Sequence, residues 1–200
     1  MHVSGGRVLG AAIAGALALQ VWGAVWWMAL SGIIQPVGNL PPEAESVVID
    51  ALLDHTVEEG AYFLPGMPVE ETPEAMESWM TKQRQGPLGM VLFHPAGVTP
   101  LDPVYFVRGF VINVAACFLA CVVMLPGVRS GWAFPHKLAG AVCFGVVASL
   151  VSYGNLWNWM HAPTDFAVKM SADVLGGWLL AGVAIAAILK GKHDPADARI

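Results

Sequence analysis

The chain has 200 residues, of which 56% are hydrophobic and only 12% are charged, and its formal net charge is −5 at pH 7. Soluble domains carry about 25% charged residues, so this composition excludes an ordinary soluble protein. The acidic balance and the lack of a basic patch also argue against nucleic acid as a partner.

Four long apolar runs account for the high hydrophobic content. They cover residues 8–34, 104–125, 138–154 and 170–189. A helix needs about 20 residues to cross the bilayer core, and the third run reaches this length only if it extends to about Trp157. Because lipid cannot satisfy unpaired backbone groups, we expect helices. The sequence predicts a membrane all-α fold, a bundle of four transmembrane helices.

The first run is too long for a secretory signal. It continues to Ile34, although "ALA" at residues 16–18 resembles a cleavage site. The apolar part of a signal peptide spans only about 7–15 residues. We therefore expect residues 1–34 to remain as a membrane anchor.

Residues 35–103 separate the first two runs and show their own secondary-structure signals. Pro41 and Pro42 suit the first turn of a helix in "NLPPEAESVVIDALLDHT". Thr72 is a candidate N-cap for a second helix that stops at Gly86. "GAYFLPG" and "LGMVLFHP" are typical of strands. We expect a small α+β domain, ordered helix, strand, helix, strand, between transmembrane helices 1 and 2.

The distribution of basic residues predicts the orientation of the helices. Six basic residues fall on one side of the predicted membrane: Arg7, Arg129, Lys137, Lys190, Lys192 and Arg199. Short cytoplasmic connections are rich in Lys and Arg, so both termini should be cytoplasmic in a bacterial inner membrane. Residues 35–103, with eleven acids and two bases, should lie outside, and residues 104–200 supply the other three helices and a short tail.

Residues 153–166, "YGNLWNWMHAPTDF", follow the third run and contain Asn155, Asn158 and His161. Trp and Tyr gather at membrane interfaces because their rings are apolar with one polar edge. We interpret the stretch as an interfacial belt, in which Asn155 and Asn158 end the helix. The alternative is a binding pocket at the outer mouth of the bundle.

Two charged residues are expected at matching depth near this mouth. Arg108 lies about one turn into the second helix and Asp173 about one turn into the fourth. Ionisable groups at such depth usually pair or face a cavity. We predict an Arg108–Asp173 ion pair, which would either pin two helices together or hold a carboxylate, a quinone headgroup or a lipid phosphate.

Polar and sulfur-bearing residues also occur within the helices. Gln20 and Asn113 lie near the middle of their helices, where an interhelical amide hydrogen bond is the ordinary expectation. Cys117, Cys121 and Met124 share one helical face. Thiolate and thioether ligands suit Cu(I), but buried Cys is more often a small hydrophobic residue.

Histidine positions provide a haem alternative at the outer surface. No pair of histidines falls in mid-bilayer, whereas His94 and His161 belong to the outer part of the chain. The sequence has no Walker A, HExxH, Gly-x-Ser-x-Gly or CxxC motif. It therefore gives no sign of an enzyme and leaves any cofactor unassigned.

Three stretches, "GAYFLPGMP", "GPLGMVLFHP" and "YGNLWNWMHAPTDFAVKMSADVLGGW", resemble small bacterial four-helix inner-membrane proteins of uncharacterised function. The resemblance covers most of the chain from about Ala61 onward. It implies a common fold with an outer domain inserted after the first helix, and it transfers no catalytic residue.

These features favour a non-enzymatic role as an accessory, assembly or scaffolding subunit that associates with lipid and with other membrane subunits. The alternative is a small-ligand or redox protein that binds quinone, haem or copper near Arg108, Asp173, His94 and His161. Absorbance spectra of the oxidised and reduced protein, with elemental analysis, discriminate the two.

Overall fold

The computed structural model describes residues 2–55 and 58–191, so Lys192 and Arg199 of the topology prediction lie outside the described residues. The chain divides into two compact units. The first comprises Met1–Pro36, Leu101–Gly154 and Asp165–Ile200, and the second comprises Val37–Pro100 and Asn155–Thr164.

Within the described ranges, four helices are long and apolar enough to cross a membrane, as predicted. They are Gly5–Ala29, Pro103–Arg129, Phe134–Trp159 and Thr164–Ile188. The first consists of α1 (Gly5–Ala24) and the π-helical turn η1 (Val25–Ala29), and the short α2 (Ser31–Ile34) follows it. The second is α5 and the fourth is α8. The third consists of α6 (Phe134–Ser149), the π-helical turn η2 (Leu150–Gly154) and α7 (Asn155–Trp159).

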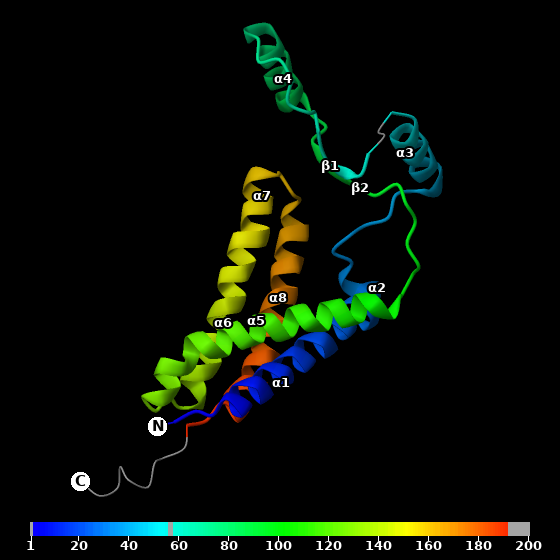
Figure 1. The fold of residues 1–200 in the computed structure, drawn as a ribbon. Coiled ribbons are helices and arrows are strands. Elements are labelled where there is room, and N and C mark those ends of the chain that lie inside the picture. The colour runs from blue at the N-terminus through cyan, green and yellow to red at the C-terminus, as the bar shows by residue number, and fades with distance from the viewer. Residues whose placement is uncertain (1, 56–57, 192–200) are drawn as a thin grey trace, which may run out of the picture. The chain divides into compact units, whose positions relative to one another are not determined.

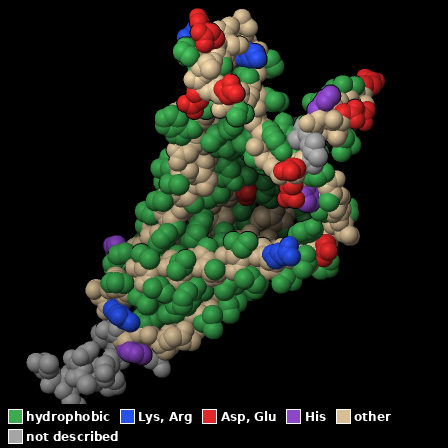
Figure 2. Space-filling model, turned by 45° about the horizontal axis from the view of Figure 1, so that its top comes forward, with side chains coloured by type: hydrophobic (Ala, Val, Ile, Leu, Met, Phe, Trp, Pro, Cys, Tyr) green, Lys and Arg blue, Asp and Glu red, His purple; other side chains and the backbone are tan. Residues whose placement is uncertain are grey.

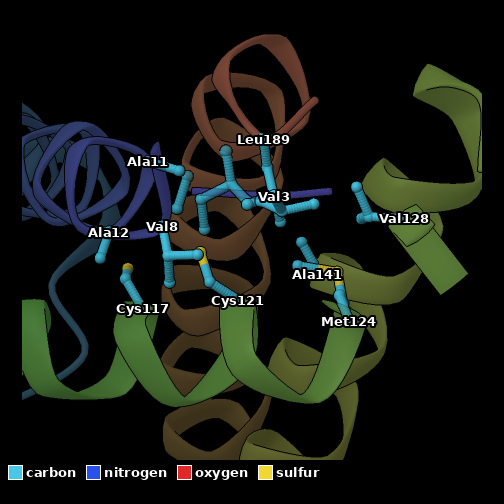
Figure 3. Packing of buried hydrophobic residues seen from close by; sticks show 12 residues of the cluster. Val3, Val8, Ala11, Ala12, Cys117, Cys121, Met124, Val128, Ala141 and Leu189 are labelled. Carbon is cyan, nitrogen blue, oxygen red and sulfur yellow. The ribbon is translucent and has the colours of Figure 1, made fainter. Parts of the chain in front are cut away.

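The first unit has its core where α1 and α5 run side by side (Figure 1). Val8, Ala11 and Ala12 of α1 are buried together with Cys117 and Cys121 of α5 (Figure 3). Lipid tails are as apolar as these side chains, so close van der Waals packing, rather than the hydrophobic effect, holds such helices together.

A glycine allows α6 and α8 to approach each other closely. A Cβ atom added at Gly145 of α6 would lie 2.7 Å from Cβ of Trp178 on α8. The indole of Trp178 also stacks on Phe144, with ring centroids 5.8 Å apart. A small residue at position 145 is therefore needed for this helix contact.

Apolar side chains cover most of the visible surface of the long helices (Figure 2). Large exposed ones occur on each of the four spans: Leu17, Val21, Val107, Ile112, Val123, Val147, Val151, Val168 and Leu179. Contiguous apolar surface on this scale is rare on soluble monomers. Such a surface is consistent with helices that span a membrane.

The second unit contains α3 (Pro42–His55), β1 (Gly60–Leu64), α4 (Pro73–Gln85) and β2 (Gly89–Phe93). This order confirms the sequence prediction of helix, strand, helix, strand. The strands pair antiparallel, with Gly60 opposite Phe93 and Leu64 opposite Gly89. The hydroxyl of Thr72 accepts a hydrogen bond from the Ala75 N–H (3.2 Å) and caps α4, as expected.

Candidate functional site

The strongest polar feature within the spans is the carboxyl group of Asp173, ten residues into α8. The indole N–H of Trp27 donates to its Oδ2 atom (3.2 Å). The indole N–H of Trp22 donates to the backbone carbonyl of the same residue (2.8 Å). Trp27 belongs to η1, and π-helical turns frequently occur at functional sites. Two indoles of the first span therefore hold this part of α8.

The predicted Arg108–Asp173 ion pair is wrong. Arg108 is exposed and joins no ion pair among the described residues. The nearest cation along α8, Lys169, pairs instead with Asp165 (2.6 Å). The two predicted partners were matched by depth alone, and depth does not fix the side of the helix from which a residue projects. Arg108 is left on the surface, where its long stem can reach lipid headgroups.

A cleft of about 300 Å³ opens beside Asp173. It is called the Asp173 cleft below, and its lining comes from α1, α5 and α8: Leu19, Trp22, Gly23, Asn113, Ala116, Asp173, Val174, Gly177 and Trp178. The side-chain amide of Asn113 donates to Oε1 of Gln20 (3.2 Å), which confirms the predicted interhelical amide hydrogen bond. That bond fixes the amide of Asn113 at the wall of the cleft.

Nothing in the sequence indicated the roles of Trp22 and Trp27, because tryptophans near the end of a span are ordinarily expected at the membrane interface. A third tryptophan, Trp26, is buried, and its indole N–H has no hydrogen-bond partner among the residues that the structure describes. Its ring lies 5.7 Å from that of Trp22. Trp22, which donates to α8, therefore packs against the buried ring of Trp26, whose N–H group donates to no described residue.

The stretch from Tyr153 to Phe166 is organised around a tight turn. Tyr153 and Phe166 meet edge to face, with ring centroids 6.2 Å apart. The indole of Trp157 donates to the hydroxyl of Thr164 (3.0 Å). His161 adopts the left-handed conformation (φ 54°), and the Ala162 N–H bonds back to the Leu156 carbonyl (3.2 Å).

Of the two asparagines expected to end the helix, Asn158 lies one residue before its end and Asn155 lies four residues before it. Asn155 is the first residue of α7, and Asn158 is an exposed residue within it. The helix ends at Trp159, two residues before the left-handed His161. Histidine adopts this conformation more readily than most side chains, which explains why it marks the turn.

The second unit has its own cavity of about 390 Å³, and its lining is mostly apolar. Trp79 and Gln83 of α4 form part of its wall, and both side chains donate to the Pro65 carbonyl (3.3 and 3.4 Å). The residues lining it are Phe63, Leu64, Pro65, Met67, Trp79, Gln83, Leu88, Gly89, Trp159, Met160 and His161. The ligand-binding alternative for His161 stays a prediction.

His94 follows β2 and is not among the residues lining this cavity. Its Nδ1 atom lies 3.0 Å from Oε2 of Glu59, and both side chains are exposed. A haem held by His94 and His161 together therefore has no support in the described geometry.

Cys117, Cys121 and Met124 lie in the helix core rather than at a cavity. Their exposed fractions are 0%, 0% and 2%. The face of α5 that carries them turns toward Val8 and Ala12 of α1 (Figure 3). No group of three His, Cys, Asp or Glu side chains within the described part of the chain could hold a metal ion. Their position is that of small apolar packing residues.

The structure also assigns a role to Lys137, which the sequence marked only as a topology signal. Its buried ammonium group donates to the carbonyls of Ala186 (2.8 Å) and Leu189 (3.0 Å) at the end of α8. Arg7 donates to the next carbonyl, that of Lys190 (2.7 Å). Cations are favourable at this end of a helix, because its last carbonyls lack partners and carry partial negative charge.

No family model, no curated protein and no solved structure matches this chain. The functional inference therefore depends on the geometry described above.

Proposed function

We propose that this protein is a non-enzymatic accessory or assembly subunit of a bacterial inner-membrane complex, and that it binds a protein partner through α3. The supporting observation is an uncovered apolar face on a helix outside the spans. No residue of α3 is buried. An apolar helix face that its own unit leaves uncovered marks an interaction site.

The α3 apolar face consists of Val47, Val48, Ala51 and Leu52. Spacings of three and four residues place these side chains on one side of the helix. Val47 is 67% exposed and Val48 is 43% exposed. Such a stripe is the pattern by which an amphipathic helix binds in the apolar groove of a partner.

The charges of α3 favour a protein partner over a lipid surface. Glu43, Asp50 and Asp54 line one edge of the apolar face, at spacings of seven and four. The helix has no Lys or Arg, whereas helices that lie on membranes are rich in both on their polar face. The expected partner therefore presents an apolar groove with a basic rim.

The expected orientation places α3 outside the cytoplasm. Arg7, Lys137 and Lys190 come together at one end of α8, and basic residues of this kind mark the cytoplasmic side. Residues 35–103 connect the opposite ends of the first two spans and carry a net charge of −9 from two bases and eleven acids. We infer that the partner is another membrane subunit with an outward-facing domain.

The test uses a photoreactive benzoylphenylalanine at position 48, in cells that express the full-length protein. The expected result is one dominant adduct with one membrane protein. Val48→Glu should reduce copurification of that protein in mild detergent more than about tenfold, because a buried unpaired charge costs several kcal/mol.

Leu53 supplies the matched control, because it is similarly exposed (54%) but lies on another side of α3. Leu53→Glu adds the same charge and should leave copurification unchanged. A monomer in mild detergent, with adducts to lipid alone, would contradict the proposal. Equal losses for the two variants would also contradict it.

A further inference from the structure

Asp173 is a carboxyl residue of a candidate membrane span, and it has no cationic partner among the residues that the structure describes. Neither Arg108 nor Lys169 pairs with it in the described chain, and the side-chain hydrogen bonds that it accepts there come from neutral indoles: Trp27 donates to the carboxylate (3.2 Å) and Trp22 to the backbone carbonyl (2.8 Å). Ionised carboxylates at this depth pair with a cation or face a polar cavity. A neutral donor does not compensate a negative charge, so the carboxyl group is either protonated or balanced by a cation from outside the described chain.

The Asp173 cleft suits a cation that is organic rather than a bare metal ion. Asp173 is the one charged residue in its described lining, which also includes two tryptophans, Trp22 and Trp178. A metal ion would need several oxygen ligands at short range. An ammonium group instead combines attraction to a carboxylate with cation–π attraction to tryptophan.

The size and polarity of the cleft agree with this chemistry. Its volume of about 300 Å³ holds a headgroup-sized molecule. Leu19, Val174 and Gly177 provide apolar contact for methyl or methylene groups, and the amide of Asn113 adds a polar contact. An ammonium ion with small alkyl substituents presents charge and apolar surface together.

We propose that the Asp173 cleft binds an ammonium group, either that of a free amine or that of a lipid headgroup. Asp173 supplies the charge, and Trp27 holds the carboxylate in place from η1. This site is separate from the partner-binding face of α3. The two proposals can therefore fail independently.

The test is a fluorescence titration of the full-length protein in dodecyl maltoside with tetramethylammonium chloride, against sodium chloride at equal ionic strength. Trp22 and Trp178 line the cleft, so binding should change tryptophan emission. We expect a saturable change with tetramethylammonium alone. If the two salts give the same response, the proposal is overturned.

Asp173→Asn should raise the titration midpoint by at least about tenfold, because it removes the charge that attracts the ligand. Asp165→Asn is the matched control, since Asp165 is on the same helix but pairs with Lys169. It should titrate like the unchanged protein. Equal midpoints for the Asp173 and Asp165 variants would refute a carboxylate site.

Ala116→Leu tests the cleft without removing the carboxylate. Ala116 lines the cleft, so a larger side chain should fill it and abolish the saturable response while Asp173 stays intact. This variant decides the matter where Asp173→Asn fails to fold. A midpoint like that of the unchanged protein would show that the ammonium ion binds elsewhere and would overturn the proposal.

Bilayer nanodiscs distinguish the two sources of the ammonium group. In discs of a neutral glucosyl diacylglycerol, whose headgroup has no ammonium group and no charge, the titration should proceed as in detergent. If the natural ligand is a lipid headgroup, phosphatidylcholine discs should shift the midpoint upward by competition. If it is a free amine, both discs should give the same midpoint. Loss of saturable binding in both kinds of disc would overturn the proposal.

Discussion

At the scale of single residues, the polar side chains within the spans are the most informative features of the structure. Lys137 is 4% exposed, which is unusual for lysine. Its burial is explained by the two hydrogen bonds that it donates to the carbonyls of Ala186 and Leu189 at the C-terminal end of α8. Asp173 differs from Lys137 in this respect. The ammonium group of Lys137 lies at the negative end of a helix, whereas the carboxyl group of Asp173 pairs with no charged group in the described chain.

Lys137→Met should lower the free energy of unfolding by about 1–3 kcal/mol, because it leaves buried carbonyls of α8 without a donor. Thermal unfolding in detergent, followed by circular dichroism, measures this. Lys82→Met is the control, since Lys82 is exposed on α4. If both variants unfold together with the parent protein, the bonds of Lys137 contribute nothing to stability.

At the scale of elements, the sequence predicted those features that depend on local patterns. The four spans, the order of α3, β1, α4 and β2, and the caps of α4 follow from apolar length, alternation and turn residues. The sequence could not predict that Trp27 holds Asp173, because this contact depends on how far η1 rotates the first span. The Gln20–Asn113 bond was predicted correctly because amides in mid-membrane have few other options.

Gly145→Ala should destabilise the contact between α6 and α8 by about 1–3 kcal/mol, because the added methyl group overlaps the Cβ atom of Trp178. That atom is fixed to its backbone, so the helices themselves have to move. The matched control is Gly154→Ala on the same span, where a Cβ atom meets nothing within 4 Å. Denaturation in detergent should separate the two, and equal midpoints would contradict the packing described.

At the scale of the whole molecule, the fold consists of an apolar set of spans and an acidic unit that is built separately. The spans leave their lipid-facing side chains exposed, while the second unit leaves an apolar face on α3 and an apolar cavity. Under the proposed function, these surfaces contact the bilayer and a partner, and the orientation of the spans decides where that partner lies.

Ser78→Cys should react with a membrane-impermeant maleimide added to spheroplasts, because Ser78 is exposed in the segment expected outside. Ser4→Cys should react only after lysis, since the N-terminus is expected to be cytoplasmic. Both variants are made in a background with the native cysteines replaced. The reverse labelling pattern would place the acidic unit in the cytoplasm and remove the basis for an outward-facing partner.

The two π-helical turns also change how the spans can be compared with other sequences. A π turn contains more residues than an α turn, so the side chains beyond it take a new angular position about the helix axis. In the first span this change falls at Val25–Ala29, and in the third at Leu150–Gly154. A deletion of one residue that restores a regular α-helix in the first span would turn Trp27 by about 100°. Natural variants with such a deletion should therefore have lost the Trp27–Asp173 contact. The positions of gaps in related chains would show whether this contact has been kept in evolution.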